Sequence, residues 1–391
     1  MILAVSKKLR LTLLSLTLII SLNSCADKTQ IKEHIIQGPT MGTQYKLVIK
    51  SNESVDLDMI SNGVDSILID IDNQMSTYNP KSEISNFNKS SFRRKEEGVY
   101  VSPHFYNVLE KSIYYHELSN GMFDIRIQSL YELWGFQNKD GNLIAEPTKE
   151  EIEELLVQGN VGLKDGKLLS KATIVGSSMS ISLPKIKDDI RTMGTGGEQT
   201  PMDGREPILR AEYIYDLSID VSAIAKGYAV DVISDYIENQ GYLNYFIDIG
   251  GEIKVSSTID RYWDIGIQEP SPERLGNAIE MVRLSNNSIA TSGNYANFIK
   301  YINSDAKRTH IINPKTGYPL EIKDGMIASV SIVAPLCVDA DALATTLMLL
   351  SKEEGLKLIE SVKDTEAYII YFEDDRLYTE QSSGFKKYIY K

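Results

Sequence analysis

Two oxygen-bearing side chains lie four residues apart in an otherwise apolar segment near the C-terminus. They are Asp341 and Thr345, and residues 340–350 are dominated by Ala, Leu and Met, which favour helix. Side chains four residues apart share a helix face, and such oxygen ligands suit Mg²⁺, which completes its shell with water and phosphate oxygens. The structural alternative is a carboxylate favoured by the helix dipole and a Thr bonded to the preceding turn, and these six residues alone favour it.

A second candidate segment runs from Asp220 to Lys226. Here a strand-like pattern changes to a helical one, and the N–H groups and dipole at the start of a helix favour an anion. The Lys226 ammonium is a compact point charge that can reach a phosphate from this position. The alternative is a solvated lysine in the first helical turn, which the helix dipole disfavours.

His310 is one of only four histidines in the chain. It follows strand-like residues and precedes the turn sequence Asn-Pro-Lys-Thr-Gly at 313–317. An unperturbed histidine titrates near neutral pH, which suits a general base. A histidine packed beside a turn and bonded to the backbone is an equally good interpretation of these residues.

Helical and strand patterns alternate along the chain and define the elements that must position these groups. Their mixture indicates an α+β, or mixed α/β, fold class. Apolar spacing, a Ser-Pro start and two capping boxes predict helices over 60–75, 102–121 and 223–239 and from 148 and 351. Runs of β-branched and aromatic residues predict strands at 43–50, 213–221, 245–249, 263–268, 327–334 and 367–372.

Charge and length limit the possible partners and the domain count. The first 24 residues contain three basic side chains and no acidic one, so the net charge of −13 becomes −16 without them. Such an acidic chain is unsuited to non-specific binding of nucleic acid or anionic lipid. The remaining stretch of about 360 residues predicts one large catalytic domain over 35–391, or two intimately packed subdomains.

Residues 1–24 are predicted to be a lipoprotein signal peptide. Three basic residues precede an apolar run over 11–22 that is too short for a stable membrane span. The run ends in Leu-Asn-Ser-Cys, which resembles the bacterial lipobox, so cleavage would precede Cys25 and Cys25 would be lipidated. Residues 25–34 would form a polar tether, and the protein would be extracytoplasmic, anchored to a bacterial membrane and facing the periplasm. An uncleaved membrane anchor leads to the same placement.

Two further features are interpreted as structural. Cys337 lies in the apolar run 333–338, so we expect a small buried residue rather than a nucleophile, and two cysteines exclude a disulfide framework. Residues 184–207 are polar, contain clustered glycines and lack any period, which predicts an exposed insertion. A loop that docks a partner is the alternative for this segment.

Nine short motifs follow one another along residues 36–372. They are Gly-Pro-Thr-Met-Gly-Thr-Gln-Tyr from residue 38, Met-Ser-Thr-Tyr from 75, Gly-Met-Phe-Asp from 121, Leu-Trp-Gly from 133, Asp-Val-Ser-Ala-Ile-Ala-Lys-Gly-Tyr-Ala-Val-Asp from 220, Asp-Ile-Gly-Gly from 248, Thr-Ser-Gly-Asn-Tyr from 291, His-Ile-Ile-Asn-Pro-Lys-Thr-Gly from 310, and Ala-Asp-Ala-Leu-Ala-Thr from 340. Each motif is weak alone, but the ordered series is specific. It resembles the ApbE family, bacterial lipoproteins that act as FAD:protein FMN transferases.

The resemblance implies an ApbE-like domain whose site binds FAD. Family contacts to the flavin or nucleotide match Met41, Tyr78, Met122, Phe123, Asp124, Asp220, Lys226 and Ile311. The Tyr78 ring can face a flat heterocycle, although an ordinary half-buried tyrosine is the alternative. Three positions, Ser222, Arg126 and Asn313, differ from residues common in the family, and these differences concern acceptor preference.

The resemblance also implies a metal site and a reaction. The Ala223 carbonyl, Asp341 and Thr345 match the family's Mg²⁺ ligands, and an oxygen-only set suits this ion. FAD would be the donor, with His310, Lys226 and Asp220 in catalytic positions. His310 would take the proton from a Thr or Ser hydroxyl of an acceptor in a flavin-carrying membrane electron-transport complex, and AMP would leave.

Two other functions stay open at this point. An FAD pyrophosphatase would use the same ligands with water in place of the acceptor hydroxyl, and the sequence does not separate it from a transferase. A lipoprotein that carries FAD without turnover is the second. The Asp341–Thr345 pair argues against a carrier, because a carrier needs no catalytic metal.

Overall fold

A computed structural model gives the structure of most of the chain. It describes residues 31–89, 99–136, 144–158, 173–176, 179–180, 208–210, 218–258, 262–271, 276–294, 298–374 and 376–390. The predicted signal peptide, Cys25 and the 184–207 insertion lie outside the described residues. Within the described ranges, no helix is both long and apolar enough to cross a bilayer.

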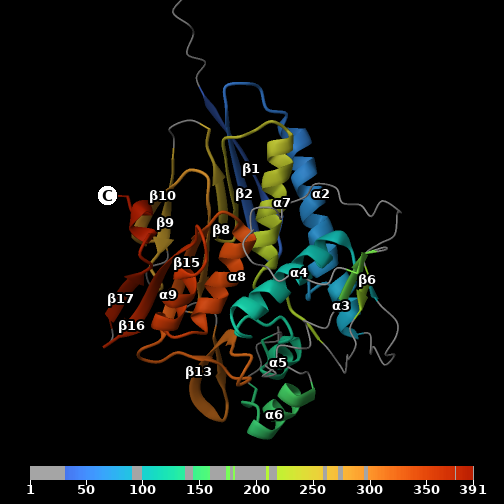
Figure 1. Cartoon of the computed structure of the whole chain (residues 1–391), viewed down its shortest axis with the longest axis vertical. Coiled ribbons are helices and arrows are strands. Elements are labelled where there is room, and N and C mark those ends of the chain that lie inside the picture. Colours follow the sequence, from blue (N-terminus) through green and yellow to red (C-terminus); the bar gives the residue numbers. More distant parts are fainter. Residues whose placement is uncertain are drawn as a thin grey trace, which may run out of the picture.

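An eight-stranded antiparallel sheet forms the centre of the fold (Figure 1). In spatial order its strands are β1 (Lys32–Thr40), β2 (Thr43–Ser51), β7 (Tyr245–Ile249), β8 (Glu252–Ser256), β11 (Ser288–Gly293), β15 (Ile327–Ala334), β16 (Glu366–Glu373) and β17 (Arg376–Gln381). Strand β15 is buried along its whole length, which agrees with its mostly apolar sequence, interrupted only by the small residues Ser329 and Ser331. Residues 32–34, which the sequence assigned to the tether, already belong to β1.

Helices cover one face of this sheet. They are α2 (Leu57–Met75), α4 (Pro103–Leu118), α7 (Ala225–Asn239), α8 (Cys337–Met348) and the shorter α9 (Lys352–Glu360). Residues such as Ile60, Val64 and Leu68 of α2 recur at helical spacing and are buried in the main core with Val330 and Ile332 of β15. The helical layer therefore exists because each helix has one apolar stripe to bury.

The opposite face of the sheet has a second apolar cluster. It is covered by the ribbon of β9 (Trp263–Gln268) and β10 (Ala278–Leu284) and by the 3₁₀ turn η3 (Phe385–Tyr388). Val333 packs on this side, while its neighbour Ile332 packs on the helical side. This alternation is the period of two expected of a strand with both faces covered.

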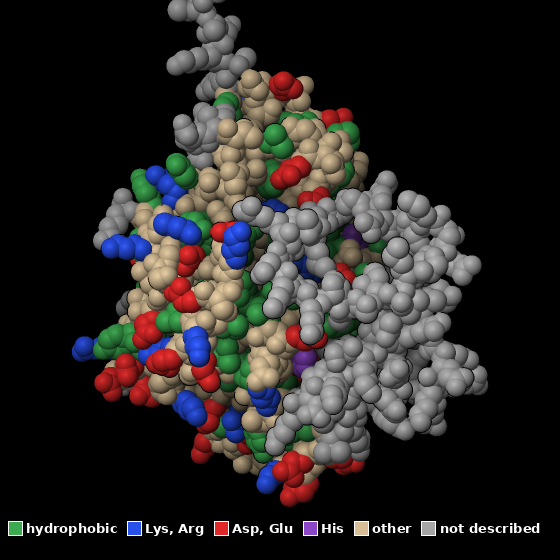
Figure 2. Space-filling view, viewed as in Figure 1, with side chains coloured by type: hydrophobic (Ala, Val, Ile, Leu, Met, Phe, Trp, Pro, Cys, Tyr) green, Lys and Arg blue, Asp and Glu red, His purple; other side chains and the backbone are tan. Residues whose placement is uncertain are grey.

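A third apolar cluster lies at the lower end of the molecule in Figure 1. We call its elements the satellite module: α5 (Gln128–Leu133), α6 (Lys149–Gln158), β12 (Phe298–Tyr301), β13 (Ser304–Ile312) and β14 (Pro319–Glu321). Acidic side chains gather at this end of the face in Figure 2, where α6 carries four glutamates. The remaining described elements are α3 (Glu83–Lys89) and the small sheet of β3 (Val99–Tyr100), β6 (Ile208–Arg210), β4 (Thr173–Gly176) and β5 (Met179–Ser180).

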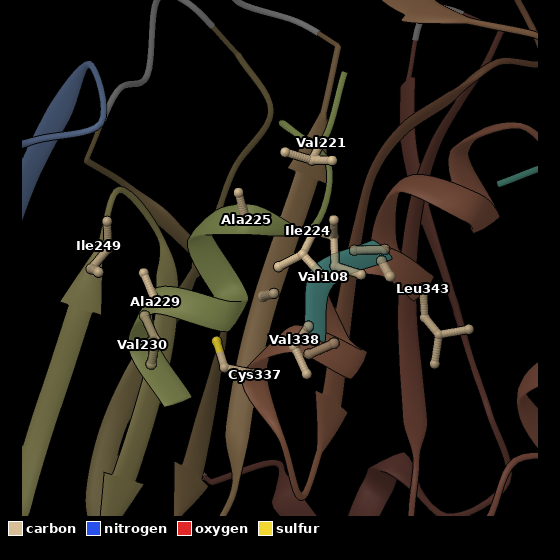
Figure 3. Close-up of a cluster of buried hydrophobic side chains, with 14 of the residues drawn as sticks. Val108, Val221, Ile224, Ala225, Ala229, Val230, Ile249, Cys337, Val338 and Leu343 are labelled. Atoms are coloured by element: carbon tan, nitrogen blue, oxygen red, sulfur yellow. The ribbon is translucent and has the colours of Figure 1, made fainter. Parts of the chain in front are cut away.

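Helices α7 and α8 approach each other closely at Gly227. A Cβ on Gly227 would lie 2.4 Å from the Cys337 carbonyl oxygen and 2.7 Å from Asp341 Cβ. Ala225 and Ala229 of α7 lie with Cys337 in one cluster of buried side chains (Figure 3). Small residues thus allow two backbones to meet where larger side chains would keep them apart.

Asp231 of α7 caps the N-terminus of α8. Its Oδ1 accepts a hydrogen bond from Cys337 N at 3.1 Å and its Oδ2 accepts one from Val338 N at 2.9 Å. The Lys254 ammonium of β8 donates to Oδ1 at 2.8 Å. Burial lowers the pKa of Lys254, but Asp231 outweighs it and raises that pKa above its ordinary value. The capping acid of α8 therefore comes from another helix, which fixes α8 relative to α7.

Most elements predicted from the sequence are confirmed. The strands at 43–50, 245–249, 263–268, 327–334 and 367–372 and the helices at 60–75 and 223–239 are present with small shifts at their ends. The capping boxes at Thr148 and Ser351 form. Ser102 stands before α4 as predicted, but its hydroxyl bonds to Gln74 rather than to the helix. Cys337 is buried, as expected.

The predicted strand at 213–221 is wrong over residues 218–221, and 213–217 lie outside the described residues. Ile219 and Val221 are buried, which explains the strand-like pattern. Among the described residues, no strand pairs with this segment: Asp220 N donates to the Ile125 carbonyl at 2.7 Å, and the Asn88 amide bonds to both backbone groups of Ile219. A loop and a side chain replace the sheet partner that the pattern suggested.

Replacing Asp231 by Ala should lower the free energy of unfolding by about 3–5 kcal/mol, because it leaves the buried Lys254 ammonium unpaired and α8 without its cap. Urea unfolding followed by circular dichroism measures this loss. The double variant Asp231→Ala/Lys254→Met removes both charges and should recover at least half of it. Equal losses in the single and double variants would contradict the assigned ion pair.

Candidate functional site

Two tight turns and the start of α7 meet at one end of the sheet. Met41 and the glycine after it have φ of +43° and +74°, the pattern of a two-residue hairpin turn between β1 and β2. A Cβ on Gly250, in the β7–β8 turn, would lie 2.8 Å from Thr43 Cγ2. Glu252, the first residue of β8, accepts a hydrogen bond from Lys226 of α7. These contacts bring Met41 and Lys226 to the same end of the sheet.

Asp341 accepts one of the free N–H groups at the start of α7. The helix begins at Ala225 with Ile224 as its N-cap, so the Gly227 N–H is one of the N-terminal donors that have no partner within the helix. Gly227 donates to Asp341 Oδ2 at 2.9 Å, which fixes this carboxylate against the start of the helix. The Ala223 carbonyl precedes the helix, and the described residues supply no hydrogen bond to its oxygen. The Asp341 carboxylate and the Ala223 carbonyl are two of the three oxygen groups that the sequence assigned to a metal.

Thr345, the third predicted metal ligand, is the one residue of α8 that is not buried. Its Oγ1 lies 3.0 Å from Ser292 Oγ of β11, one helical turn beyond Asp341 on the same face. Its neighbour Thr346 makes the bond to the preceding turn, donating to the Ala342 carbonyl at 2.7 Å. The structural alternative for a threonine in this segment therefore describes Thr346, and the half-buried Thr345 shares the Asp341 face of α8.

Lys226 is a half-buried lysine beside two acids. Its Nζ lies 2.5 Å from Glu252 Oε1, so it is not the solvated lysine of the alternative interpretation. Burial lowers the pKa of Lys226, but Asp341 and Glu252 together raise it above the ordinary value. Two ionised carboxylates and one ammonium would leave a buried excess of negative charge, which favours a cation at this position.

The pKa values of Glu252 and Asp341 are raised at this crowded, buried position. Burial raises the pKa of Glu252 to about 8; Lys226 opposes the shift and Asp341 adds to it. Burial also raises the pKa of Asp341, against the effects of Lys226 and the Gly227 N–H. Glu252 Oε2 is buried and has no hydrogen-bond partner among the described residues. A positive ion nearby would relieve both shifts.

Asp220 and Tyr78 lie together on the other side of the α7 start. Asp220 is buried, its Oδ1 accepts a hydrogen bond from Ser222 N at 2.6 Å, and burial raises its pKa. Burial raises the pKa of the Tyr131 phenol of α5, and the nearby Tyr78 and Asp220 raise that pKa further. Tyr78 is 55% exposed, so its ring is available to a flat ligand.

The segment from Met122 to Asp124 is less open than the sequence suggested. Met122 and Phe123 are buried. Both oxygens of Asp124 accept hydrogen bonds from the Arg126 guanidinium, at 2.8 Å from Nε and 2.5 Å from Nη2, and His116 Nδ1 lies 3.6 Å away. The structure thus gives the Asp124 carboxylate an internal partner, and Arg126 is the residue that differs from family usage.

His310 and Ile311 lie on β13, between two cores. Ile311 packs in the main core and Ile312 in the satellite core, while His310 is half-buried between the buried Thr309 and Ile311. The histidine is therefore held by a strand whose alternate side chains are anchored in different clusters. This agrees with a positioned side chain rather than a mobile one.

The sequence interpretation missed three residues of this site. Glu252 directly follows the Asp-Ile-Gly-Gly motif, and Ser292 lies within the Thr-Ser-Gly-Asn-Tyr motif, so motif position was an available signal for both. Tyr131 carried no signal, because tyrosine is common in this chain and its contacts to Tyr78 and Asp220 are made only in three dimensions.

Comparisons with known proteins agree with this arrangement. The model of the ApbE family matches residues 41–369. The chain belongs to the ApbE family. A FAD:protein FMN transferase of Vibrio cholerae is 30% identical over 91% of this chain and 92% of its own length, and one of Haemophilus influenzae is 28% identical over 97% and 98%. The solved flavin transferase ApbE from Vibrio cholerae superposes with a TM-score of 0.69 and 28% identity, over 92% of this chain and all of that one.

The residues present fit a divalent cation of the Mg²⁺ type. Within the described part of the chain, no group of three His, Cys, Asp or Glu side chains could hold a metal. The set predicted from the sequence instead offers one carboxylate, one hydroxyl and the Ala223 carbonyl. Mg²⁺ commonly uses few protein oxygens and keeps water or phosphate ligands, so this sparse set suits it better than a metal that needs a protein cage.

Glu252 should make the stability of the cation-free protein depend on pH. Its pKa rises from 4.5 in the unfolded chain to about 8 in the folded one, so its contribution is complete below about pH 4.5 and is lost as the pH rises through 8. In EDTA, the melting temperature should fall between pH 6 and 9 by roughly 3–6 °C more in the wild type than in Glu252→Gln.

Differential scanning calorimetry of both proteins at each pH measures this difference. Glu373→Gln, at the exposed end of β16, is the control and should follow the wild type. Parallel curves for wild type and Glu252→Gln would show that Glu252 does not titrate in this range.

Proposed function

We propose that this protein is an Mg²⁺-dependent FAD:protein FMN transferase. It transfers FMN from FAD to a Thr or Ser hydroxyl of an acceptor protein and releases AMP. The names of its relatives support this proposal. The observation that carries it is the α7–α8 junction, where the Ala223 carbonyl, Asp341 and Thr345 present oxygen atoms close to the Lys226 ammonium.

The protein's own groups bind and orient FAD in this proposal. The pyrophosphate lies at the start of α7, where the helix dipole and Lys226 favour negative charge. The exposed ring of Tyr78, oriented by Tyr131, and Met41 at the β1–β2 turn contact the flavin. Asp220 bonds to the nucleotide. Asp124 contributes mainly by holding its loop through Arg126.

The proposed metal site has one role in this function, which is to neutralise charge. Ala223, Asp341 and Thr345 would hold Mg²⁺, which when bound neutralises charge on the pyrophosphate. Gly227 keeps Asp341 oriented through its N–H, and Lys226 keeps Glu252 close to the cluster. These contacts fix the oxygen groups before substrate arrives, so little reorganisation is needed on binding.

The transfer step forms one bond to phosphorus and breaks another. His310 takes the proton of the acceptor hydroxyl, and the hydroxyl oxygen forms a bond to the phosphorus on the FMN side. The bond between that phosphorus and the bridging oxygen breaks, and AMP leaves with the bridging oxygen. FMN remains joined to the acceptor through a phosphoester.

Intact-mass measurement decides between this reaction and its alternatives. The chain, FAD, Mg²⁺ and an acceptor domain from a flavin-carrying membrane electron-transport subunit are incubated, and adduct and AMP are quantified together. One FMN less one water on the acceptor, with equal AMP, supports transfer. AMP and free FMN without an adduct indicate a pyrophosphatase. Bound FAD without AMP indicates a carrier.

We also propose that the protein is lipidated at Cys25 and anchored to a bacterial membrane on the periplasmic side. The support is the basic start, the short apolar run and the lipobox-like sequence. Its acceptors would then be subunits of membrane electron-transport complexes in the same compartment. Cys25→Ala should shift the protein from the membrane fraction to the soluble fraction, and an unchanged distribution would contradict lipidation at this residue.

Loss of Asp341 should reduce activity more than loss of His310. Phosphoryl transfer depends chiefly on positioning and charge neutralisation, so we expect about a 10³-fold lower kcat for Asp341→Asn and about 10²-fold for His310→Ala. Single-turnover AMP release measures both rates. Glu373→Gln, at the exposed end of β16, serves as the control. Equal or reversed losses would count against this division of roles.

A further inference from the structure

The Leu-Trp-Gly motif at 133–135 has no part in the reaction described so far. Its Trp134, at the end of α5, is fully buried in the satellite core. The indole Nε1 donates to the Gly317 carbonyl at 2.8 Å, and the Tyr301 hydroxyl donates to the Trp134 carbonyl at 2.9 Å. Trp134 is therefore bonded to both β12 and the turn that follows His310.

That turn is closed and tightly packed. Gly317 N donates to the Asn313 carbonyl at 2.8 Å, and Asn313 N donates to the Tyr318 carbonyl at 2.9 Å. A Cβ on Gly317, whose φ is +72°, would lie 2.5 Å from Ile152 Cγ2 of α6. Because this turn is packed so closely, a shift of the turn also shifts the end of β13. His310, three residues before Asn313, lies in that end of the strand.

The other end of α5 lies against the nucleotide side of the site. Ile125, just before α5, accepts the Asp220 N–H at 2.7 Å. Tyr131, within α5, lies next to Tyr78 and Asp220. One short helix thus contacts the Asp220 segment at its start and the His310 turn at its end.

We propose that Trp134 is the positioning residue of His310. Through its Nε1 bond to Gly317, it sets the place of β13 relative to the start of α7, and so the distance between the base and the phosphate. This inference rests on the proposed transfer function. Trp134 itself touches neither substrate nor reacting atoms.

A matched pair of variants tests the bond. Trp134→Phe keeps an aromatic ring and removes the donor to Gly317, whereas Tyr301→Phe removes the donor on the opposite side of the same residue. In the full chain, Trp134→Phe should lower the rate of adduct formation about tenfold and leave FAD affinity, measured by flavin fluorescence, within twofold. Tyr301→Phe should change neither by more than twofold. Equal rate losses in both variants would overturn the proposal.

A double-mutant cycle separates positioning from general destabilisation. If Trp134 acts through His310, then adding Trp134→Phe to His310→Ala should slow transfer by less than twofold. A further tenfold loss in that background would show that Trp134 acts elsewhere. This cycle also removes the contribution of the cavity that the smaller Phe leaves in the satellite core.

Hydrogen exchange gives a readout that does not depend on the reaction. Trp134→Phe should speed amide exchange over 309–317 and leave 220–230 unchanged; unchanged exchange at 309–317 would overturn the positioning role. A wild-type protein that forms neither AMP nor adduct would instead refute the proposed function. The two failures are therefore distinguishable.

Discussion

The site depends on the contact between α7 and α8 at Gly227. This glycine has no side chain, so Asp341 can reach its N–H, and that single bond orients the carboxylate against the start of α7. Asp231, one turn further along α7, caps the N-terminus of α8 and fixes the position of α8 relative to α7. The two helices thus share donors and acceptors, and neither could move without breaking the oxygen cluster.

The charges of the cluster follow from the same contact. Bringing α7 against α8 and β8 buries Lys226 with two carboxylates, and burial alone would neutralise the acids. Such an arrangement is unfavourable by itself and is stabilised by an added positive ion. In the proposed function, a bound divalent cation would relieve this excess of negative charge.

The sequence predicted the helices at 223–239 and 340–350, because helical spacing and composition are local signals. The metal role of Ala223, Asp341 and Thr345 stays a prediction. The sequence did not predict that Asp341 accepts a hydrogen bond from Gly227 N, since this contact requires two helices to meet. Asp124 shows the same limit: its motif position suggested a ligand contact, while Arg126 occupies both oxygens in the fold. The error at 218–221 arose because burial by loops resembles burial in a sheet.

The order of strands in the sheet has a consequence for how the protein folds. Tyr45 of β2 pairs with Ile249 of β7, so the chain must close a very long loop before this edge of the sheet can form. Pairings so distant along the chain form slowly, and Asp341 is supplied later still. A chain that lacks α8 therefore has no assembled oxygen cluster, and the cluster forms only when both halves of the domain have folded together.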